Sequence, residues 1–461
     1  MITLKIRNMI KTRIAPAPTG KLHIGSARTA LFNYLFAKKN SGSFVLRIED
    51  TDKERSKQEF ERDIIENLEW LGLKWDEFYK QSERIEIYKK YLKKIVNEGK
   101  AFWCDCFPEK EKPFFCQKHK KTKNNKEQVM NNGIIRFNMP KNKEITFKDI
   151  IRGKVKFNTN DIGDFSIAKN LDTPLYNFAV VIDDYEMLIT HIIRGEDGIS
   201  NTPKQVLLYD AFNFEIPEFA HIPLILDTDR SKLSKRKNAV AIGDYKKQGY
   251  LGNAMINFLA LLGWHPKDER EIFNLKDLIK EFSLERVKKG GAVFDFQKLD
   301  DINGYYINQM PIKDLCGLLK SQITNQINNS FFKKIVEIEK GRMKKLNDFF
   351  ELTDHYFKDK LEYNKELLFW KEMSKNDLKK SLENSHNVLN DISEKNWNLE
   401  NIKNILMEES GKRNYRGEFL WPLRVALSGK KFSASPFEIA WALGKKTSLK
   451  RINEAQNKIL V

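Results

Sequence analysis

The sequence predicts an α/β fold followed by a region built from helices, and three observations support this prediction. A strand-like run at 12–15 leads through a turn rich in proline and glycine into a stretch whose apolar residues have helical spacing. Strand-like and helical patterns then alternate as far as residue 226, which is typical of a parallel sheet covered by helices. From about Ser330 onward the pattern is helical, with lysine, arginine and glutamate dispersed along it.

The first turn has the composition of a phosphate-binding site. Gly20 and Gly25 bring no side chain to positions where a nucleotide would approach, and His23 lies between them as a donor. A helix that begins directly after a strand presents free N–H groups and a partial positive charge to a phosphate. A loop histidine in such a turn is nevertheless often structural or solvated, so the turn alone is weak support for a nucleotide site.

The next elements follow from their own patterns. The apolar run at 43–52 ends in carboxylates, so it predicts a buried parallel strand. Glu49 then lies at the end of the strand where open α/β sheets bind ligands. Apolar residues at helical spacing predict helices at 60–71 and 88–95, whereas the segment 102–172 is irregular apart from a strand-like run at 134–137.

Beyond this segment the alternation of strands and helices resumes. We expect, in order, strands at 174–183 and 185–197, a helix at 203–212, a strand at 219–226 and a helix at 251–262. A βαβ pattern interrupted in this way predicts a split Rossmann-type fold. In the C-terminal region, the segment 422–429 is an exception to the helical pattern.

Bulk properties restrict the class of protein. The 461 residues suffice for several domains, and no apolar run is long enough to cross a bilayer. The formal net charge of +18 suits a polyanionic partner, although a bias toward lysine codons would raise it as well. Four cysteines make no disulfide framework, which indicates a reducing compartment. The first ten residues show no secretory signal pattern, so we expect a cytoplasmic protein.

A second basic stretch lies far from the first turn, at 231–237, where Lys232 and Lys235 bracket Ser234. Together with His23-Ile-Gly-Ser26, the segment Lys232-Leu-Ser-Lys-Arg236 resembles the paired motifs His-x-Gly-His and Lys-Met-Ser-Lys-Ser of class I aminoacyl-tRNA synthetases. The stretches TRIAPAPTGKLHIGSARTALFNYLFA, FVLRIEDTDKERS, THIIRGEDGISNTP and KLSKRKNAV resemble bacterial glutamyl-tRNA synthetases. This resemblance extends over nearly the whole chain.

The resemblance implies an enzyme that activates L-glutamate with ATP and Mg²⁺ and transfers it to tRNA(Glu), and it leaves open whether tRNA(Gln) is also charged. It implies a monomer. It also implies a division of the chain into a Rossmann catalytic domain in two halves, an acceptor-binding insertion, a stem-contact domain and a helical anticodon-binding domain. The expected boundaries are 1–101 and 173–240 for the two catalytic halves, 102–172 for the insertion, 241–325 for the stem-contact domain and 326–461 for the anticodon-binding domain.

The same resemblance implies the residues of the active site. His23, Lys232 and Lys235 are the expected catalytic residues, because they would stabilise the charge that develops on the phosphates of ATP. The residues expected to bind ATP are Pro18, Thr19, Gly20, His23, Gly25, Ser26, Lys232, Ser234 and Lys235. The residues expected to bind glutamate are Arg13, Ala15, Ala17, Glu49, Tyr176 and Arg194. Among these, Glu49 would take the α-ammonium group, and Arg13 is the candidate partner of the γ-carboxylate.

Within the insertion, Cys104, Cys106, Cys116 and His119 form a set of soft thiolates with one imidazole, a combination that suits tetrahedral zinc. The resemblance also allows zinc, because some members of the family hold it here. The alternative is a group of free thiols beside a loop histidine. His119 is the least certain member, because its spacing from Cys116 departs from the expected pattern.

Three other functions fit parts of the sequence. A small-molecule nucleotidylyltransferase shares the His-x-Gly-His turn, but this class does not explain the basic helical C-terminal third. A truncated paralogue that glutamylates a modified tRNA base would lack that third. A non-catalytic RNA-binding paralogue would be expected to have lost His23 or the lysine pair, and both are present.

Overall fold

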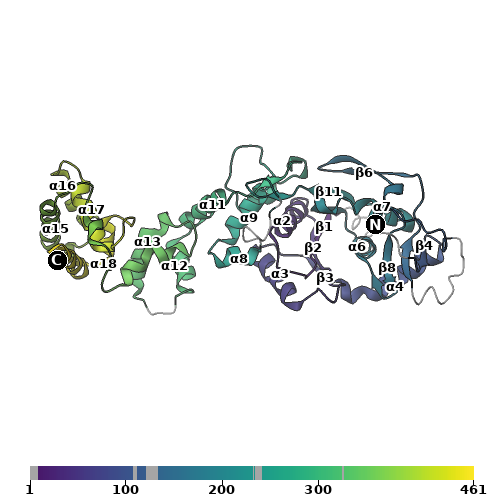
Figure 1. Cartoon of the computed structure of the whole chain (residues 1–461), viewed down its shortest axis with the longest axis horizontal. Helices are drawn as coiled ribbons and strands as arrows, with labels where there is room; N and C mark the ends of the chain where they lie inside the picture. Colours follow the sequence, from purple (N-terminus) through teal and green to yellow (C-terminus); the bar gives the residue numbers. More distant parts are fainter. Residues whose placement is uncertain are drawn as a thin grey trace. The chain divides into compact units, whose positions relative to one another are not determined.

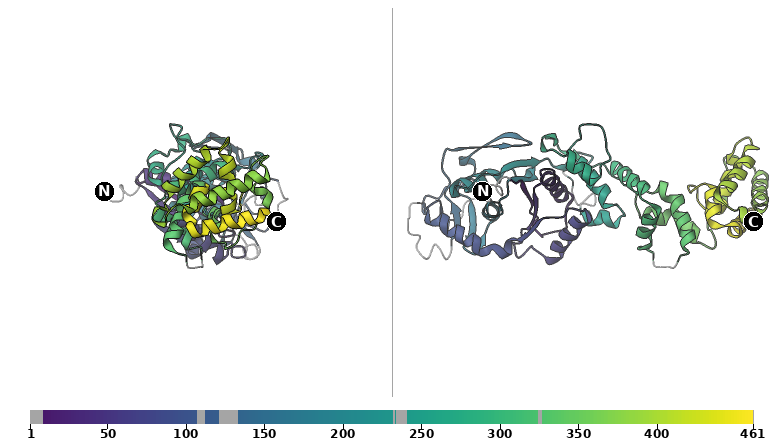
Figure 2. Two further views of the ribbon diagram at one scale, coloured as in Figure 1. Left: turned by 90° about the vertical axis from the view of Figure 1, so that its left-hand side faces the viewer. Right: turned by 180° about the vertical axis from the view of Figure 1, so that it is seen from behind.

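The computed structural model describes residues 9–106, 112–120, 133–231, 233, 241–323 and 327–460. The chain forms two compact units, Met1–Ile302 and Asn303–Val461. Unit 1 combines strands and helices, whereas the described part of unit 2 contains helices and no strand (Figures 1 and 2). The predicted α/β fold with a helical C-terminal region is therefore confirmed.

The centre of unit 1 is a parallel sheet that lies where the first motif predicted it. Strands β1 (Lys11–Ile14), β2 (Ser43–Ile48) and β3 (Glu77–Lys80) pair in parallel, and β10 (His191–Gly195) pairs in parallel with β11 (Glu218–Ile222). Thr190 joins the two groups, since its N–H donates to the Lys11 carbonyl at 2.9 Å and its Oγ1 accepts from the Lys11 N–H at 2.9 Å. The strand order is thus β3-β2-β1-β10-β11, and it reverses between β1 and β10, where sheets of this kind bind ligands.

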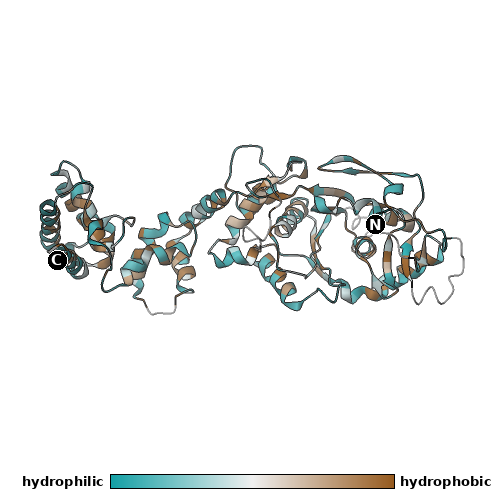
Figure 3. Cartoon of the chain, in the orientation of Figure 1, coloured by the Kyte–Doolittle hydropathy of each residue, from teal (hydrophilic) through white to brown (hydrophobic). Residues whose placement is uncertain are grey.

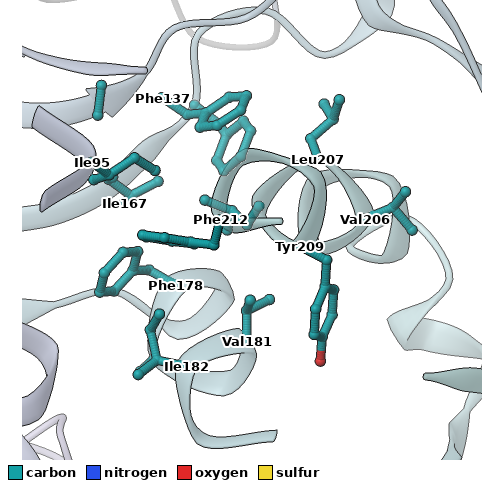
Figure 4. Packing of buried hydrophobic residues seen from close by; sticks show 14 of the residues in the cluster. Ile95, Phe137, Ile167, Phe178, Val181, Ile182, Val206, Leu207, Tyr209 and Phe212 are labelled. Carbon is teal, nitrogen blue, oxygen red and sulfur yellow. The ribbon is translucent and has the colours of Figure 1, made fainter. Parts of the chain in front are cut away.

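Helices cover this sheet, and four of them lie where the apolar spacing predicted them: α2 (Ile24–Lys39), α3 (Gln58–Trp70), α4 (Ile85–Asn97) and α7 (Thr202–Phe212). A fifth helix, α6 (Tyr176–Glu186), was not predicted. Helices α6 and α7 pack against each other, and Figure 4 shows Phe178 and Val181 of α6 beside Phe212 of α7 in one buried apolar cluster. This packing fixes α6 beside the sheet.

The segment between the two halves of the sheet is more regular than the sequence indicated. Strands β4 (Ala101–Cys104), β5 (Ile134–Phe137), β8 (Ser166–Asn170) and β9 (Thr173–Pro174) form an antiparallel sheet. Strands β6 (Glu144–Asp149) and β7 (Gly153–Asn158) form a hairpin, and β6 pairs in parallel with β11. The hairpin therefore extends the central sheet. Its β6 strand alternates between exposed and buried residues, as expected for a strand with one covered face.

The strand predicted at 174–183 is wrong, because these residues form most of α6. The segment reads as a strand because Val180, Val181 and Ile182 are β-branched and the apolar run has no polar interruption. In the structure every residue from Phe178 to Asp184 is buried. A helix buried on all sides gives the same continuous apolar run as a buried strand, so periodicity alone does not separate the two.

The exception expected at 422–429 is also wrong, since these residues lie mostly in α17 (Gly417–Ser428). Pro422 lies inside this helix and has no N–H to donate to the carbonyl of Glu418, four residues earlier. The hydroxyl of Ser381 donates to that carbonyl instead, at 2.8 Å. A side chain from another helix thus compensates for the proline, which local sequence does not reveal.

The remaining elements complete the two units. Unit 1 contains β12 (Ile225–Leu226), which pairs in parallel with β13 (Ala292–Val293), and the helices α8 (Ile242–Lys247), α9 (Gly252–Leu261) and α10 (Leu275–Glu281). Helix α11 (Phe296–Gln309) spans the boundary at residue 302. Unit 2 contains α12 (Ile312–Lys320), α13 (Asn329–Glu339), α14 (Asp348–Thr353), α15 (Lys375–Asn390), α16 (Leu399–Gly411), α17, α18 (Pro436–Leu443) and α19 (Lys445–Leu460).

The helices of unit 2 alternate hydrophilic and hydrophobic residues along their length, as Figure 3 shows. In α15, for example, Leu378, Leu382 and Leu389 are buried at helical spacing. Among the described residues, no helix is long and apolar enough to cross a membrane.

Candidate active site

A cavity of about 350 Å³ opens at the carboxyl ends of β1 and β10, where the strand order reverses. Eight of the residues predicted for the site line it: Arg13, Ala15, His23, Gly25, Ser26, Glu49, Tyr176 and Arg194. Ala17, Pro18, Thr19 and Gly20 lie in the turn before α2 and are not among the lining residues. Lys232, Ser234 and Lys235 lie outside the described residues.

His23 is the N-cap residue of α2 and lies at the end of the turn that connects β1 to this helix. Its Nδ1 accepts the N–H of Gly25 at 3.1 Å, so a neutral ring carries its proton on Nε2. No acidic residue occupies the first turn of the helix, which leaves the positive end of the helix dipole uncompensated by a side chain there. A helix N-terminus of this kind suits an anion such as the phosphate expected from the sequence.

The segment that contains the two predicted lysines begins and ends beside this turn. Leu233 is buried, lines the cavity and donates its N–H to the carbonyl of Ile225 at 3.2 Å. At the other end, Ala241 forms an antiparallel bridge with His23, and the N–H of Ile242 donates to the carbonyl of Leu22 at 2.9 Å. The fold therefore brings both flanks of the lysine segment to the cavity.

Three buried arginines line the cavity: Arg28 donates to backbone carbonyls, whereas Arg13 and Arg194 have side-chain partners that differ in charge. Arg13 donates from Nε and Nη2 to the two carboxylate oxygens of Asp184, at 3.1 and 3.3 Å. Arg194 donates from Nη2 to Thr202 Oγ1 at 2.8 Å and from Nε to His221 Nε2 at 3.2 Å. Among the described residues, no carboxylate lies within ion-pair distance of Arg194, and burial lowers the pKa of this arginine.

His221 holds Arg194 in place with help from the insertion. Its Nδ1 lies 2.6 Å from Asp149 at the end of β6, and burial lowers the pKa of this histidine, which favours the neutral ring. The neutral ring donates from Nδ1 to Asp149 and accepts at Nε2 from Arg194. The sequence did not identify Asp149 or His221 as site residues. They meet because β6 pairs with β11, and no pattern in either segment indicates this pairing.

Glu49 lies just beyond β2 at the opposite wall of the cavity, with its side chain 10% exposed. Burial raises the pKa of its carboxyl to about 7, although Arg47 and Arg13 oppose this shift. Arg47 Nη2 donates to Glu49 Oε1 at 3.2 Å. Tyr176, the first residue of α6, completes this wall, and its hydroxyl lies 3.5 Å from Arg194 Nη1. Two acidic residues, Glu49 and Asp197, and three arginines thus line one small cavity.

The structure brings the four predicted metal ligands together beside the antiparallel sheet. The ligand atoms of Cys104, Cys106, Cys116 and His119 all lie within 4.8 Å of one another. Cys104 Sγ lies 3.7 Å from Cys116 Sγ, and His119 Nδ1 lies 3.4 Å from Cys116 Sγ and 3.6 Å from Cys106 Sγ. Ligands on a tetrahedral zinc ion are separated by about 3.3–3.8 Å when the bonds are about 2.0–2.3 Å long. The cluster therefore fits zinc in both chemistry and spacing.

Residues around the cluster would orient its ligands. Asp105 Oδ1 lies 3.2 Å from His119 Nε2, the position that a carboxylate takes behind a metal-bound histidine. The N–H of Cys116 donates to Asp164 Oδ2 at 2.8 Å. Burial raises the pKa of the Cys104 thiol to about 12, so the buried thiol is protonated unless a cation stabilises the thiolate.

Comparisons with known proteins agree with this geometry. Residues 9–301 match the family model described as the catalytic domain of class I tRNA synthetases (E and Q), and residues 312–456 match the model of an anticodon binding domain. The chain is 41% identical to the glutamate–tRNA ligase of Carboxydothermus hydrogenoformans, with 96% of this chain and 99% of that protein covered. It is 40% identical to the corresponding ligase of Aquifex aeolicus, with 91% and 93% covered.

A solved structure is similar over the same extent. The crystal structure of a glutamate tRNA ligase from Elizabethkingia meningosepticum, in complex with its amino acid, superposes with a TM-score of 0.87 at 31% identity. It covers 98% of this chain and 99% of that chain.

Proposed function

The chain belongs to the class I tRNA synthetases for glutamate and glutamine, and from this we infer that it is a glutamate–tRNA ligase. Such an enzyme activates L-glutamate with ATP to give glutamyl-adenylate and pyrophosphate. It then transfers the glutamyl group to the 3′-terminal adenosine of tRNA(Glu). The observation that carries the proposal is the cavity between β1 and β10, where a histidine-capped helix N-terminus meets a pocket whose lining includes Arg13, Arg194 and Glu49.

Aminoacylation assays test this function directly. Purified tRNA(Glu) and tRNA(Gln) are each incubated with ATP, Mg²⁺ and either labelled glutamate or labelled glutamine. We expect glutamate to be transferred to tRNA(Glu) and glutamine to neither tRNA. Transfer of glutamine but not glutamate would contradict the proposal, and the tRNA(Gln) assay with glutamate decides whether that tRNA is also a substrate.

For the first step we assign the histidine turn and the lysine segment to ATP. The α-carboxylate of glutamate is already a nucleophile, so the protein contributes position and electrostatic stabilisation rather than a base. His23 Nε2 would donate to the phosphates at the N-terminus of α2, and Lys232 and Lys235 would neutralise the charge that spreads over them. Mg²⁺ would enter with ATP, bound mainly by the phosphates. The turn residues Pro18, Thr19, Gly20, Gly25 and Ser26, together with Ser234, would surround the nucleotide.

For glutamate we assign each end of the substrate to one wall of the cavity. Glu49 would pair with the α-ammonium group, and Tyr176 with Ala15 and Ala17 would border the chain. Arg13 and Arg194 would bind the γ-carboxylate. Because Asp184 already balances Arg13, whereas Arg194 has neutral partners, Arg194 would supply the larger share of the attraction. Glutamine offers no charge to either arginine, so the pocket would select by charge rather than by size.

We further propose that Cys104, Cys106, Cys116 and His119 hold one structural zinc ion. The ligand spacing and the carboxylate behind His119 support this assignment. A bound ion would keep β4 and the loop at 112–120 together within the segment 102–172, which is assigned to the acceptor end of the tRNA.

The remaining assignments follow the expected domain plan. Residues 1–101 and 173–240 would form the catalytic halves, and 102–172, 241–325 and 326–461 would contact the acceptor end, the stem and the anticodon of the tRNA. We propose a cytoplasmic monomer, in line with four cysteines that are unpaired in the structure. Light scattering of the purified protein tests the monomer, and two copies per particle would contradict it.

A further inference from the structure

Two charged residues behind the cavity have no place in the function proposed so far. Arg47 on β2 and Asp184 on α6 are buried, with fully inaccessible side chains, and neither lines the cavity. Arg47 Nη1 donates to Asp184 Oδ1 at 2.8 Å. Removing two charges from water is costly, so such a pair requires compensation from further partners.

Those partners are residues that do line the cavity. Asp184 accepts from Arg13 through both carboxylate oxygens, and Arg47 donates to Glu49. The result is one chain of ion pairs, Arg13–Asp184–Arg47–Glu49, that links β1, α6 and β2. Its two ends face the cavity and its two middle members lie behind it.

The contacts within this chain of ion pairs restrict the orientation of the two side chains at its ends, Arg13 and Glu49. Asp184 engages Nε and Nη2 of Arg13, so the guanidinium plane is fixed and Nη1 is the nitrogen left to donate to a substrate. At the other end, Arg47 holds one oxygen of Glu49, and the second oxygen remains for an ammonium group. Helix α6 is itself locked by its packing on α7 (Figure 4), so Asp184 is a rigid anchor.

We propose that Arg47 and Asp184 are positioning residues for glutamate, which hold Arg13 and Glu49 at the two walls of the cavity through this chain of ion pairs. The inference rests on the proposed function, since it assigns Arg13 and Glu49 to the substrate. Neither Arg47 nor Asp184 touches substrate; they act through the residues that do.

The charges around Glu49 predict the direction in which each substitution shifts the pKa of its carboxyl. The groups that face it are Arg47 on its own strand, Arg13 on β1, and Asp184, Asp183 and Tyr176 on α6. Burial raises the pKa of Glu49 to about 7, the two arginines lower it, and the two aspartates raise it. Loss of the Asp184 charge therefore lowers the pKa of Glu49, and loss of the Arg47 charge raises it.

The test is glutamate-dependent ATP–pyrophosphate exchange with tRNA(Glu) present, measured across pH 5.5 to 8.5 (about three units around the midpoint). The group to follow is Glu49, and kcat/KM for glutamate in the wild type should rise as this carboxyl ionises near pH 7. In Asp184→Asn the midpoint moves to lower pH and KM for glutamate rises by roughly 10- to 100-fold, because Arg13 loses a buried charged partner. In Arg47→Gln, which removes the positive charge, the midpoint moves to higher pH. The KM for ATP changes little in both variants.

Asp183→Asn is a graded control on the same helix. Asp183 is equally buried and lies 3.7 Å from Arg47 Nε, but its hydrogen-bond partners are Gln81, Arg84 and Tyr88, and it does not bind Arg13. We expect this variant to lose thermal stability and to move the midpoint to lower pH, as Asp184→Asn does. Its KM for glutamate should stay closer to the wild-type value, because Arg13 keeps its carboxylate partner. Thermal unfolding of each variant records the stability change separately from the kinetics.

The outcomes separate the proposals. Wild-type KM and midpoint in a folded Asp184→Asn overturn the positioning role, and so do midpoints that move in the same direction in Asp184→Asn and Arg47→Gln. If Asp184→Asn does not fold, Arg47→Gln decides alone, and an unchanged midpoint in it overturns the proposal. A wild-type protein that shows no glutamate-dependent exchange contradicts the proposed function instead.

Discussion

Arg194 differs from Arg13 and Arg47 in the charge of its partners. Thr202 and a neutral His221 hold it in a buried position, whereas Asp184 balances the other two. A buried cation without a negative partner is unfavourable until a carboxylate binds. The γ-carboxylate of glutamate would supply that charge, whereas the amide of glutamine would not. We therefore expect the pocket to prefer glutamate over glutamine.

We predict that Arg194→Gln removes most of this preference. Losing a desolvated charge pair costs about 2–5 kcal/mol, which corresponds to about 30- to 5,000-fold in kcat/KM for glutamate. Pyrophosphate exchange with each amino acid, in the presence of tRNA(Glu), measures the effect. Arg13→Gln should also reduce glutamate activation and narrow the gap between the two amino acids, but less than Arg194→Gln does.

Arg194→Lys is the control, because lysine keeps the positive charge but lacks the planar guanidinium group. We expect it to retain part of the preference for glutamate over glutamine. Wild-type discrimination in Arg194→Gln would show that the γ-carboxylate is bound elsewhere. An equal loss in the two glutamine variants would assign the two arginines equal shares.

The second residue prediction concerns the lysine segment. Lys235→Ala should lower the rate of adenylate formation by orders of magnitude, because it removes positive charge from the transition state at the phosphates. Binding of tRNA should be nearly unchanged. Single-turnover formation of the adenylate and filter binding of tRNA(Glu) measure the two effects, with Lys237→Ala as the matched control in the same segment. Normal activation in Lys235→Ala would remove it from the mechanism.

At the scale of elements, the cysteine cluster joins β4 to the loop at 112–120. We predict one zinc per chain in protein purified without chelators or a polyhistidine tag, as measured by elemental analysis. Cys104→Ala/Cys116→Ala should lose the metal, because two of the four ligands are gone. Cys316→Ala, which removes the cysteine of unit 2, should keep it. Protein without zinc, or a double variant that retains it, would contradict the site.

Helix α17 allows a quantitative test of how its proline is tolerated. Ser381→Ala leaves the carbonyl of Glu418 without its hydroxyl donor and should destabilise unit 2 by about 1–3 kcal/mol. In a Pro422→Ala background the new N–H can bind that carbonyl, so the same Ser381→Ala change should have a much smaller effect. Urea unfolding of the wild type, the two single variants and the double variant gives the four free energies of unfolding of this double-mutant cycle. Equal losses in both backgrounds would show that Ser381 does not compensate for Pro422.

At the scale of the whole molecule, the excess of basic residues predicts how tRNA binding responds to salt. With a net charge of +18, phosphate contacts should release counterions, so the logarithm of the tRNA affinity falls linearly with the logarithm of salt concentration. The KM values for ATP and glutamate should change far less. Filter binding of tRNA from low to moderate salt measures this slope. An affinity that does not change with salt would indicate that the net positive charge comes from a general excess of lysine codons rather than from an RNA-binding surface.

The sequence predicted the elements with strong local patterns and missed those that depend on distant partners. The first turn, α2, α3, α4, α7 and α9 follow from apolar spacing and turn chemistry, and eight predicted site residues meet in one cavity. Helix α6 was misread because burial on all sides removes periodicity. Asp184 contacts Arg13 across 171 positions, and Asp149 contacts His221 across 72, so no local signal could identify either pair.

The central position of β1 has a consequence for biosynthesis. Its partner on one side, β2, follows within a few dozen residues, but the Lys11–Thr190 contact on the other side spans 179 positions. A ribosome that adds about 5–20 residues per second needs roughly ten seconds or more to deliver that partner. During this interval β1 lacks the partner on its second side, and Arg13 and Arg47 lack Asp184, which lies on α6. The cavity between β1 and β10 therefore forms only after about 190 residues have been made, and until then β1 is an unpaired edge of the kind that favours wrong pairing.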